Sequence, residues 1–358
     1  MEGAFPTGKL PPGVLGRLLK DYARPGRGVV VGPGIGMDAA VLDIGAWGAR
    51  GNEPGGAAGA GCPASDYLVA KTDPITFVSE DIGAYAITIN ANDVACTGGT
   101  PRWFTMAVIL PEGGADEALV ESIFRSASET CDSLGISLVG GHTEITHGLD
   151  RPIVVGHMLG TVPRDRVITT SGARPGDTII LTKGIAIEAV SIIAREKAGE
   201  LSEHYHEDFI QQCRDYVTKP GISVSKDARI ALAAGDVHCM HDPTEGGLSS
   251  GLYEIAEAAG VGLEVRAKDI RVLPEAFELL RRYRLDPLGS IASGALVITA
   301  PPSDAERIIA ALDAEDINAY DIGVVTDKAD GVKLVKASGT VDLPVFARDE
   351  ITRLFCRD

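Results

Sequence analysis

The chain has 358 residues and a formal net charge of −17, from 33 lysines and arginines against 50 aspartates and glutamates. This acidic balance argues against a nucleic-acid partner or an anionic membrane surface, although a nucleotide can still bind to carboxylates through Mg²⁺. No stretch approaches about 18 consecutive apolar residues, and the start, MEGAFPTGKL, has no basic region followed by an apolar one, so we expect neither a transmembrane helix nor a signal peptide. Six cysteines without a CxxC pair favour reduced thiols and a cytoplasmic protein.

The first half of the chain predicts a mixed α/β domain. The expected elements are a helix within 12–23, strands near 38–44 and 67–72, a helix over 81–97, a strand over 103–110, a helix over 115–135, and strands over 136–141 and 152–162. Residues 45–66 are rich in Gly, Ala and Pro and have no apolar period, which predicts a flexible insertion.

The second half predicts another α/β domain, separated from the first by the turn-rich SGARPGDT. Its expected elements are strand 177–182, helix 185–197, helices across 204–234, a helix ending at 259, strand 262–265, helix 274–284, strand 295–300, helix 303–313 and strands around 320–336. We therefore expect two domains, 1–170 and 171–358, because a chain of this length exceeds what one core usually serves.

The helix expected over 81–97 carries an unusual carboxylate. Asp93 projects into an apolar stripe formed by Ile82, Ala86 and Ile89. A carboxylate on a buried face is costly unless it is paired. A metal ion, an arginine or a set of backbone N–H groups would each serve, and a buried Asp held by local hydrogen bonds is the alternative.

Three other carboxylates border a strand end or a glycine break in the same half. Asp38 follows the glycine-rich VGPGIGM, which lacks the lysine of a P-loop; Asp73 ends VAKTD directly before a proline; Glu144 follows SLVGGHT. Taken singly, each has a simple explanation as a turn or cap residue. Together they indicate a magnesium site, because Mg²⁺ prefers carboxylates supplemented by waters and phosphate oxygens.

The second half offers two further motifs. HDPTEGGL (241–248) places Asp242, Thr244 and Glu245 at a helix start, where capping is a sufficient alternative. LTKGIAIEA (181–189) predicts a strand, a turn and a helix whose N–H groups can face an anion, or a plain connection. His238 and His241 have an HxxH spacing, but no further ligands are evident, so we expect no zinc site.

The order of GxGxDAAV, KTDP, NANDVACTGGTPRW, VGGHTE, GDTIILTKG and HDPTEGGL resembles the aminoimidazole-ribonucleotide-synthetase-like (PurM-like) superfamily, which includes selenophosphate synthetase, thiamine-monophosphate kinase and HypE. The chain is most similar to the HypE branch and its AIR synthase-related members, from about Gly8 to about Lys336. The resemblance implies a two-domain α/β (α+β) fold. Its N-terminal domain would form a β-barrel-like dimer interface, and its C-terminal domain would be an α/β sandwich.

The resemblance also implies ATP and Mg²⁺ as cofactors and assigns roles to residues. It implies Asp38, Asp73 and Asp93 as metal ligands. It implies catalytic roles for Asp93, Glu144 and Lys9, the last resembling a lysine in a mobile arm that covers the phosphates. It implies nucleotide binding by Asn92, Gly140, Gly141, His142, Thr143, Asp242, Glu245 and Gly246.

The implied reaction activates a carbonyl, amide or phosphate oxygen by phosphoryl transfer, on a small-molecule or carbamoyl-type substrate. The alternatives are a kinase like thiamine-monophosphate kinase, or a non-catalytic nucleotide-binding protein that acts with a maturation partner. HypE ends in a Pro-Arg-hydrophobic-Cys tail, whereas this chain ends LFCRD. Cys356 is thus either a displaced carrier thiol or an ordinary cysteine.

Overall fold

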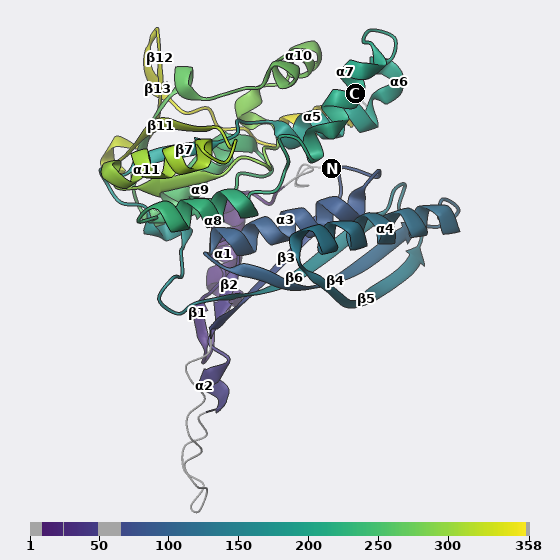
Figure 1. The fold of residues 1–358 in the computed structure, drawn as a ribbon, viewed down its shortest axis with the longest axis horizontal. Coiled ribbons are helices and arrows are strands. Elements are labelled where there is room, and N and C mark those ends of the chain that lie inside the picture. Colours follow the sequence, from purple (N-terminus) through teal and green to yellow (C-terminus); the bar gives the residue numbers. More distant parts are fainter. Residues whose placement is uncertain (1–8, 24, 49–65, 356–358) are drawn as a thin grey trace, which may run out of the picture. The chain divides into compact units, whose positions relative to one another are not determined.

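The computed structural model describes residues 9–23, 25–48 and 66–355 (Figure 1). The chain divides into two compact units. The nucleotide-motif unit, as we call it, comprises Leu18–Thr76 and Asp81–Val167, and the C-terminal unit comprises the chain up to Arg17, Phe77–Glu80 and the chain from Ile168 onwards. The domain limits expected from the sequence stay a prediction.

The nucleotide-motif unit is a six-stranded sheet with its two long helices, α3 and α4, on one face (Figure 1). The strand order is β1-β2-β3-β6-β4-β5. The strands are β1 (Val29–Val31), β2 (Ala40–Leu42), β3 (Tyr67–Ile75), β4 (Thr100–Pro111), β5 (Ser137–Thr146) and β6 (Ile153–Val162), and the helices of this part of the chain are α1 (Pro12–Tyr22), α2 (Gly45–Gly48), α3 (Ile82–Cys96) and α4 (Glu117–Leu134).

Two strands run further than the sequence predicts. β3 continues through Asp73 to Ile75, and β5 continues through Gly140 and Gly141 to Thr146. The expectation that each strand stops at these breaks was wrong, because ladder pairing with β6 and with β4 carries both strands onward. β4 is also only half buried: its side chains alternate between the two faces of the sheet.

Helix α3 is more deeply buried than one apolar stripe requires. Every residue from Ile82 to Cys96 except Ala84 is buried. The helix packs on β3, β4 and β6 and also against α4. The contact with α4 is close at Gly83, where an added Cβ would lie 2.3 Å from the Ile123 carbonyl oxygen.

We predict that Gly83→Ala lowers the free energy of unfolding by about 1–3 kcal/mol, because the two helix backbones must separate to admit a methyl group. Gly26→Ala is the control in the same unit, since a Cβ at this glycine meets nothing within 4 Å. Urea unfolding followed by tryptophan fluorescence measures the change, because Trp47 and Trp103 both belong to the nucleotide-motif unit. Equal midpoints for the two variants would contradict the close helix contact.

The C-terminal unit holds a seven-stranded sheet of order β13-β12-β9-β11-β7-β10-β8. Its core lies between this sheet and α9, and includes Ile179, Leu181, Leu252 and Ile255. The strands are β7 (Thr178–Thr182), β8 (Cys239–His241), β9 (Gly262–Arg266), β10 (Val297–Ala300), β11 (Ala319–Thr326), β12 (Val332–Lys336) and β13 (Gly339–Asp342), and the helices are α5 (Ile187–Glu196), α6 (Ala198–Leu201), α7 (Glu207–Arg214), α8 (Ser225–Ala234), α9 (Gly247–Ala259), α10 (Pro274–Tyr283) and α11 (Pro302–Asp313).

These two sheets with their helices confirm the expected α/β fold class. The six-stranded sheet is open in one chain, so the barrel-like dimer interface stays a prediction. Within the described residues, no helix is long and apolar enough to cross a membrane. Residues 49–65 of the expected insertion lie outside the described part of the chain, and Gly45–Gly48 form α2.

Candidate functional site

One lysine contacts two of the three aspartates expected to bind metal, and the charge of the third acts on it. The Lys71 ammonium is 2.8 Å from Asp93 Oδ1 and 3.5 Å from Asp73 Oδ2. Lys71 and Asp73 are two residues apart on β3, so they share the face of the sheet that α3 covers. Burial by itself would lower the pKa of Lys71, but the charges of Asp93, Asp73 and then Asp38 raise it above its ordinary value, so the ammonium stays charged.

The Lys71–Asp93 ion pair explains how the Asp93 carboxylate can lie on a buried helix face. From the sequence we expect a metal ion, an arginine or backbone N–H groups as its partner; the structure shows a lysine beside it, and the metal ion stays a prediction. The carboxylate is tolerated on a buried helix because an opposite charge lies within hydrogen-bond distance. The sequence predicts a strand end at Asp73-Pro74, and this hides the alternation that places Lys71 and Asp73 on one face of β3.

Asn90 adds an oxygen near this cluster. Its amide nitrogen donates to the carbonyl oxygens of Asp73 (3.3 Å) and Ala86 (2.9 Å). Its Oδ1 is buried without a hydrogen-bond partner among the described residues. Gly156, which pairs with Asp73 on β6, makes room for it: an added Cβ would lie 2.3 Å from the Asn90 amide nitrogen.

These donors fit a magnesium ion. Asp73 from a strand and Asp93 from a helix contact one ammonium, Asp38 from a loop adds its charge there, and a buried amide oxygen without a partner belongs to the same helix as Asp93. Hard oxygen ligands of this kind are what Mg²⁺ takes in proteins. Asn92 lies beside Asp93 on α3 and is fully buried.

The residues of β5 lie elsewhere in the unit. β6 and β4 stand between β3 and β5, which places β5 roughly 14 Å from β3 at ordinary strand spacing. Strand pairing across β6 and β4 places Gly141 of β5 level with Asp73, so the two residues share one face of the sheet. Glu144 is three residues beyond Gly141 and therefore projects from the opposite face. One chain therefore does not bring Glu144 to the aspartates. His142 and Glu144 are exposed and contact each other, with 3.3 Å between Nε2 and Oε2.

In the C-terminal unit, HDPTEGGL forms the end of β8, a turn and the start of α9. The capping alternative was wrong: the N-cap of α9 is Gly246, with no side-chain cap. Gly246 and Gly247 have φ values of 82° and 65°, a region that favours glycine. A Cβ on Gly247 would also lie 2.6 Å from the Leu288 carbonyl oxygen, so the turn needs both glycines.

Asp349, from the end of the chain, holds this turn. Its Oδ2 accepts from the Gly246 N–H at 2.6 Å and its Oδ1 from the Ile351 N–H at 2.8 Å. Burial raises the pKa of Asp349 to about 7, against these backbone hydrogen bonds, and the nearby Glu245 adds to the rise. Nothing in the HDPTEGGL motif indicates this distant carboxyl.

Lys9 and His241 meet at one carboxylate of α9. The Lys9 ammonium is 3.3 Å from Glu254 Oε1, and His241 Nε2 is 2.8 Å from Glu254 Oε2. Burial would raise the pKa of Glu254, but Lys9 and His241 together lower it to about 2. The structure thus brings Lys9 to the residue that precedes Asp242, through a glutamate that the sequence did not single out.

We predict that Glu254→Gln destabilises the protein by about 3 kcal/mol at pH 7, from the lowered pKa of Glu254. Because the folded-state pKa lies below the ordinary value, this stability is present above about pH 4.5 and is lost as the pH falls to about 2. Urea unfolding at pH 7 and pH 3 measures it. The exposed Glu257→Gln, on the same helix, is the matched control, and equal losses in the two variants would contradict the ion pair.

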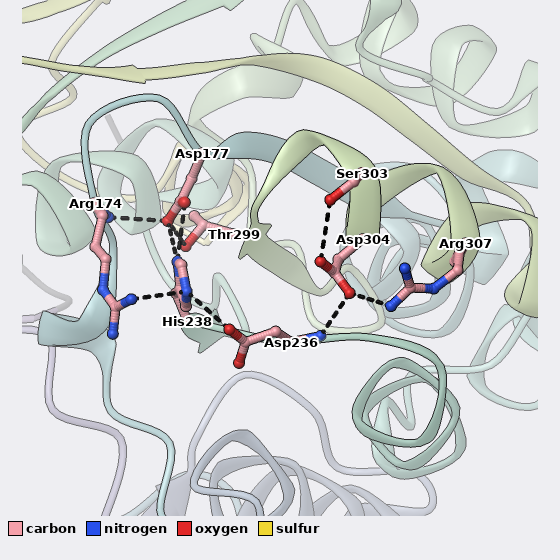
Figure 2. A network of polar contacts seen from close by, with 8 residues as sticks. All are labelled: Arg174, Asp177, Asp236, His238, Thr299, Ser303, Asp304 and Arg307. Carbon is pink, nitrogen blue, oxygen red and sulfur yellow. Dashed lines mark hydrogen bonds and ion pairs between the residues drawn. The ribbon is translucent and has the colours of Figure 1, made fainter.

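The two histidines of the HxxH spacing bind different partners. Figure 2 shows His238 between Asp177 and Arg174: Nδ1 is 2.9 Å from both Asp177 oxygens, and Nε2 is 3.0 Å from the Arg174 guanidinium. Asp177 also binds the Arg174 N–H and the Thr299 hydroxyl. This network joins the start of β7 to β8 and β10.

Two family models match most of the chain. Residues 36–162 match the N-terminal domain of AIR synthase related protein, and residues 174–336 match its C-terminal domain. The chain belongs to the AIR synthase related family. The carboxylate cluster falls in the first match and HDPTEGGL in the second.

The relatives of this AIR synthase related chain include proteins of the HypE type. It is 31% identical to the carbamoyl dehydratase HypE of Cupriavidus necator over 260 residues, 70% of each chain. It is 28% identical to a putative hydrogenase expression/formation protein of Methanocaldococcus jannaschii, over 76% of this chain and 79% of the relative. A crystal structure of hydrogenase maturation protein HypE in complex with ATP superposes with a TM-score of 0.66 at 25% identity, covering 78% of this chain and 85% of the other.

Proposed function

We propose that this protein is an Mg²⁺- and ATP-dependent enzyme of the HypE type, which activates a carbonyl, amide or phosphate oxygen by phosphoryl transfer. One observation carries the proposal: two carboxylates in the family-matched region, Asp73 and Asp93, contact one half-buried cation, and a third, Asp38, adds its charge there. Relatives named carbamoyl dehydratase and a HypE structure holding ATP support it.

In this proposal, Asp38, Asp73 and Asp93 hold the metal, with Asn92 beside them. Bound Mg²⁺ would neutralise charge on the phosphates, which supplies much of the catalysis in phosphoryl transfer. Further nucleotide contacts are proposed for Gly140, Gly141, His142, Thr143, Asp242, Glu245 and Gly246, and catalytic roles for Lys9, Glu144 and Asp93. The ammonium of Lys9 suits a phosphate oxygen as a point charge.

We also propose a homodimer. The face of the six-stranded sheet away from α3 carries half-buried apolar side chains, among them Ile109, Val155 and Leu159. Trp103, in the same row as Leu159, is 41% exposed. A second sheet packed on this face would cover these side chains.

The substrate in this proposal is a small molecule or a carbamoyl group, with a maturation protein as a possible presenter of the latter, in the cytoplasm. The four described cysteines are buried, and burial raises the pKa of Cys131 to about 11 and of Cys213 to about 12, so neither thiol suits a carrier role. Cys356 and Cys62 lie outside the described residues. A kinase like thiamine-monophosphate kinase, which needs no thiol, is the alternative enzyme.

Product analysis tests the proposal. We expect wild-type protein with Mg²⁺–ATP to form ADP, and Asp93→Asn to lose at least about 99% of that rate, as for removal of a metal ligand. Asp150→Asn, an equal charge change at a 91% exposed side chain, should retain it. Free phosphate favours the dehydratase, whereas phosphate transferred to added thiamine monophosphate favours the kinase. No ADP in any condition would leave only a non-catalytic nucleotide-binding role.

A further inference from the structure

Lys71 occupies the place where a metal ion is expected. It is 2.8 Å from Asp93 and 3.5 Å from Asp73, and its side chain is only 19% exposed. Asp93 is more deeply buried still, with 6% of its side chain exposed. Three carboxylates and one ammonium leave the cluster with two negative charges, and the deepest carboxylate is already paired.

A divalent cation that arrives alone meets an obstacle at this ammonium. Mg²⁺ binds carboxylate oxygens at about 2.1 Å, closer than a lysine does, so it must displace Lys71 from Asp93 or bear its repulsion. A displaced ammonium at a buried position needs another anion, because an uncompensated buried charge is costly. Within the cluster, the alternative anions are the other metal ligands themselves.

A nucleotide removes the obstacle. Its phosphate oxygens offer Lys71 a charge-assisted hydrogen bond in exchange for the one to Asp93. Metal and phosphate then bind together: Mg²⁺ replaces Lys71 as the partner of the aspartates, and the phosphates replace the aspartates as the partner of Lys71. This exchange needs no further residue.

We propose that Lys71 couples metal binding to nucleotide binding: it occupies the aspartates while the site is empty and moves to the phosphates when Mg²⁺ and nucleotide enter. Lys71 is in this sense a positioning residue for the metal ligands. The inference rests on the proposed function, since it takes a nucleotide as the second ligand. By thermodynamic reciprocity, nucleotide must raise the metal affinity by the same factor as metal raises the nucleotide affinity.

The test uses Mn²⁺ as the probe, followed by electron paramagnetic resonance on the full chain. Without nucleotide, we expect Lys71→Met to bind Mn²⁺ at least about tenfold more tightly than wild type, because a repelling charge has been removed. Lys71→Arg retains the charge and should stay near wild type. Lys226→Met, the same change at an exposed lysine paired with Glu315, is the matched control. Equal Mn²⁺ affinities for Lys71→Met and wild type would overturn the inference.

Wild-type protein alone also decides the question if Lys71→Met does not fold. We expect little Mn²⁺ bound at about 100 µM without nucleotide and clear binding once the ATP analogue AMPPCP is added. Saturation with Mn²⁺ in the absence of AMPPCP would contradict the coupling. If wild type binds no AMPPCP even with Mn²⁺, the proposed function fails instead, while the Lys71→Met comparison still reports on the competition at the aspartates.

Discussion

Asp227→Ala is expected to lower the free energy of unfolding by about 3–5 kcal/mol, the cost of leaving a buried charge without its partner. Lys183, at the end of β7, is 7% exposed, and both oxygens of Asp227 lie 3.3 Å from its ammonium. Its other partner is the Ser223 carbonyl oxygen at 2.5 Å. Burial lowers the pKa of Lys183, against the effect of Asp227, so without this carboxylate the ammonium is poorly compensated.

Urea unfolding followed by circular dichroism measures this change, with a double variant as its control. Lys183→Met with Asp227→Leu removes both charges, and apolar replacements of a buried pair are often neutral or stabilising. We therefore expect the double variant to recover most of the stability that Asp227→Ala loses. An Asp227→Ala protein as stable as wild type would show that the pair is not buried as the structure describes it.

Asp349 is expected to make stability fall by about 4 kcal/mol between about pH 4 and pH 7, because its folded-state pKa is about 7 and its ordinary value is near 4. Below the lower pKa, both the folded and the unfolded state hold the proton. As the pH rises, the unfolded state loses its proton first, and the folded state carries the cost of keeping it until its own pKa is reached. Stability from this group is thus present at low pH and lost toward neutral pH.

Urea unfolding of wild type and of Asp349→Asn at pH 4, 5.5 and 7 measures this effect. The difference between their free energies of unfolding isolates Asp349 from the other carboxylates. Because Asn cannot titrate, the pH dependence that Asp349 causes should appear in full in this free-energy difference. Asp342→Asn, at a 79% exposed side chain in the same unit, should show no such slope. A wild-type curve parallel to that of Asp349→Asn would contradict the raised pKa.

Most long elements follow from periodicity, and the errors have local causes. The helix over 81–97 and the helix over 115–135 are confirmed as α3 and α4, because apolar spacing and the glycines after each helix mark them. β8 and β13 have three and four residues, too few to show a period. At β5, two glycines indicate an end, yet pairing with β4 carries the strand through them.

Residues of the candidate site could be predicted where the signal lies in neighbouring residues, and not where residues distant in the sequence come together. Asp93 could be singled out because a carboxylate on an apolar helix face is a visible conflict. Its partner Lys71 could not be predicted in this way, because the packing of α3 on β3 is a tertiary contact that no local pattern indicates. Glu254 and Asp349 lie 13 or more residues from the groups they contact, His241 and Gly246, and only the tertiary fold connects them.

Isothermal titration of AMPPCP into the full chain, with and without Mg²⁺, tests the central claim most directly. We expect metal-dependent binding by wild type and by Asp150→Asn, and a loss of at least about a hundredfold in affinity, or about 2.7 kcal/mol, in Asp93→Asn. That result would place nucleotide and metal at the Lys71–aspartate cluster. No binding by wild type in either condition, or equal binding by Asp93→Asn, would contradict the account and leave Asp93 and Lys71 as a structural ion pair.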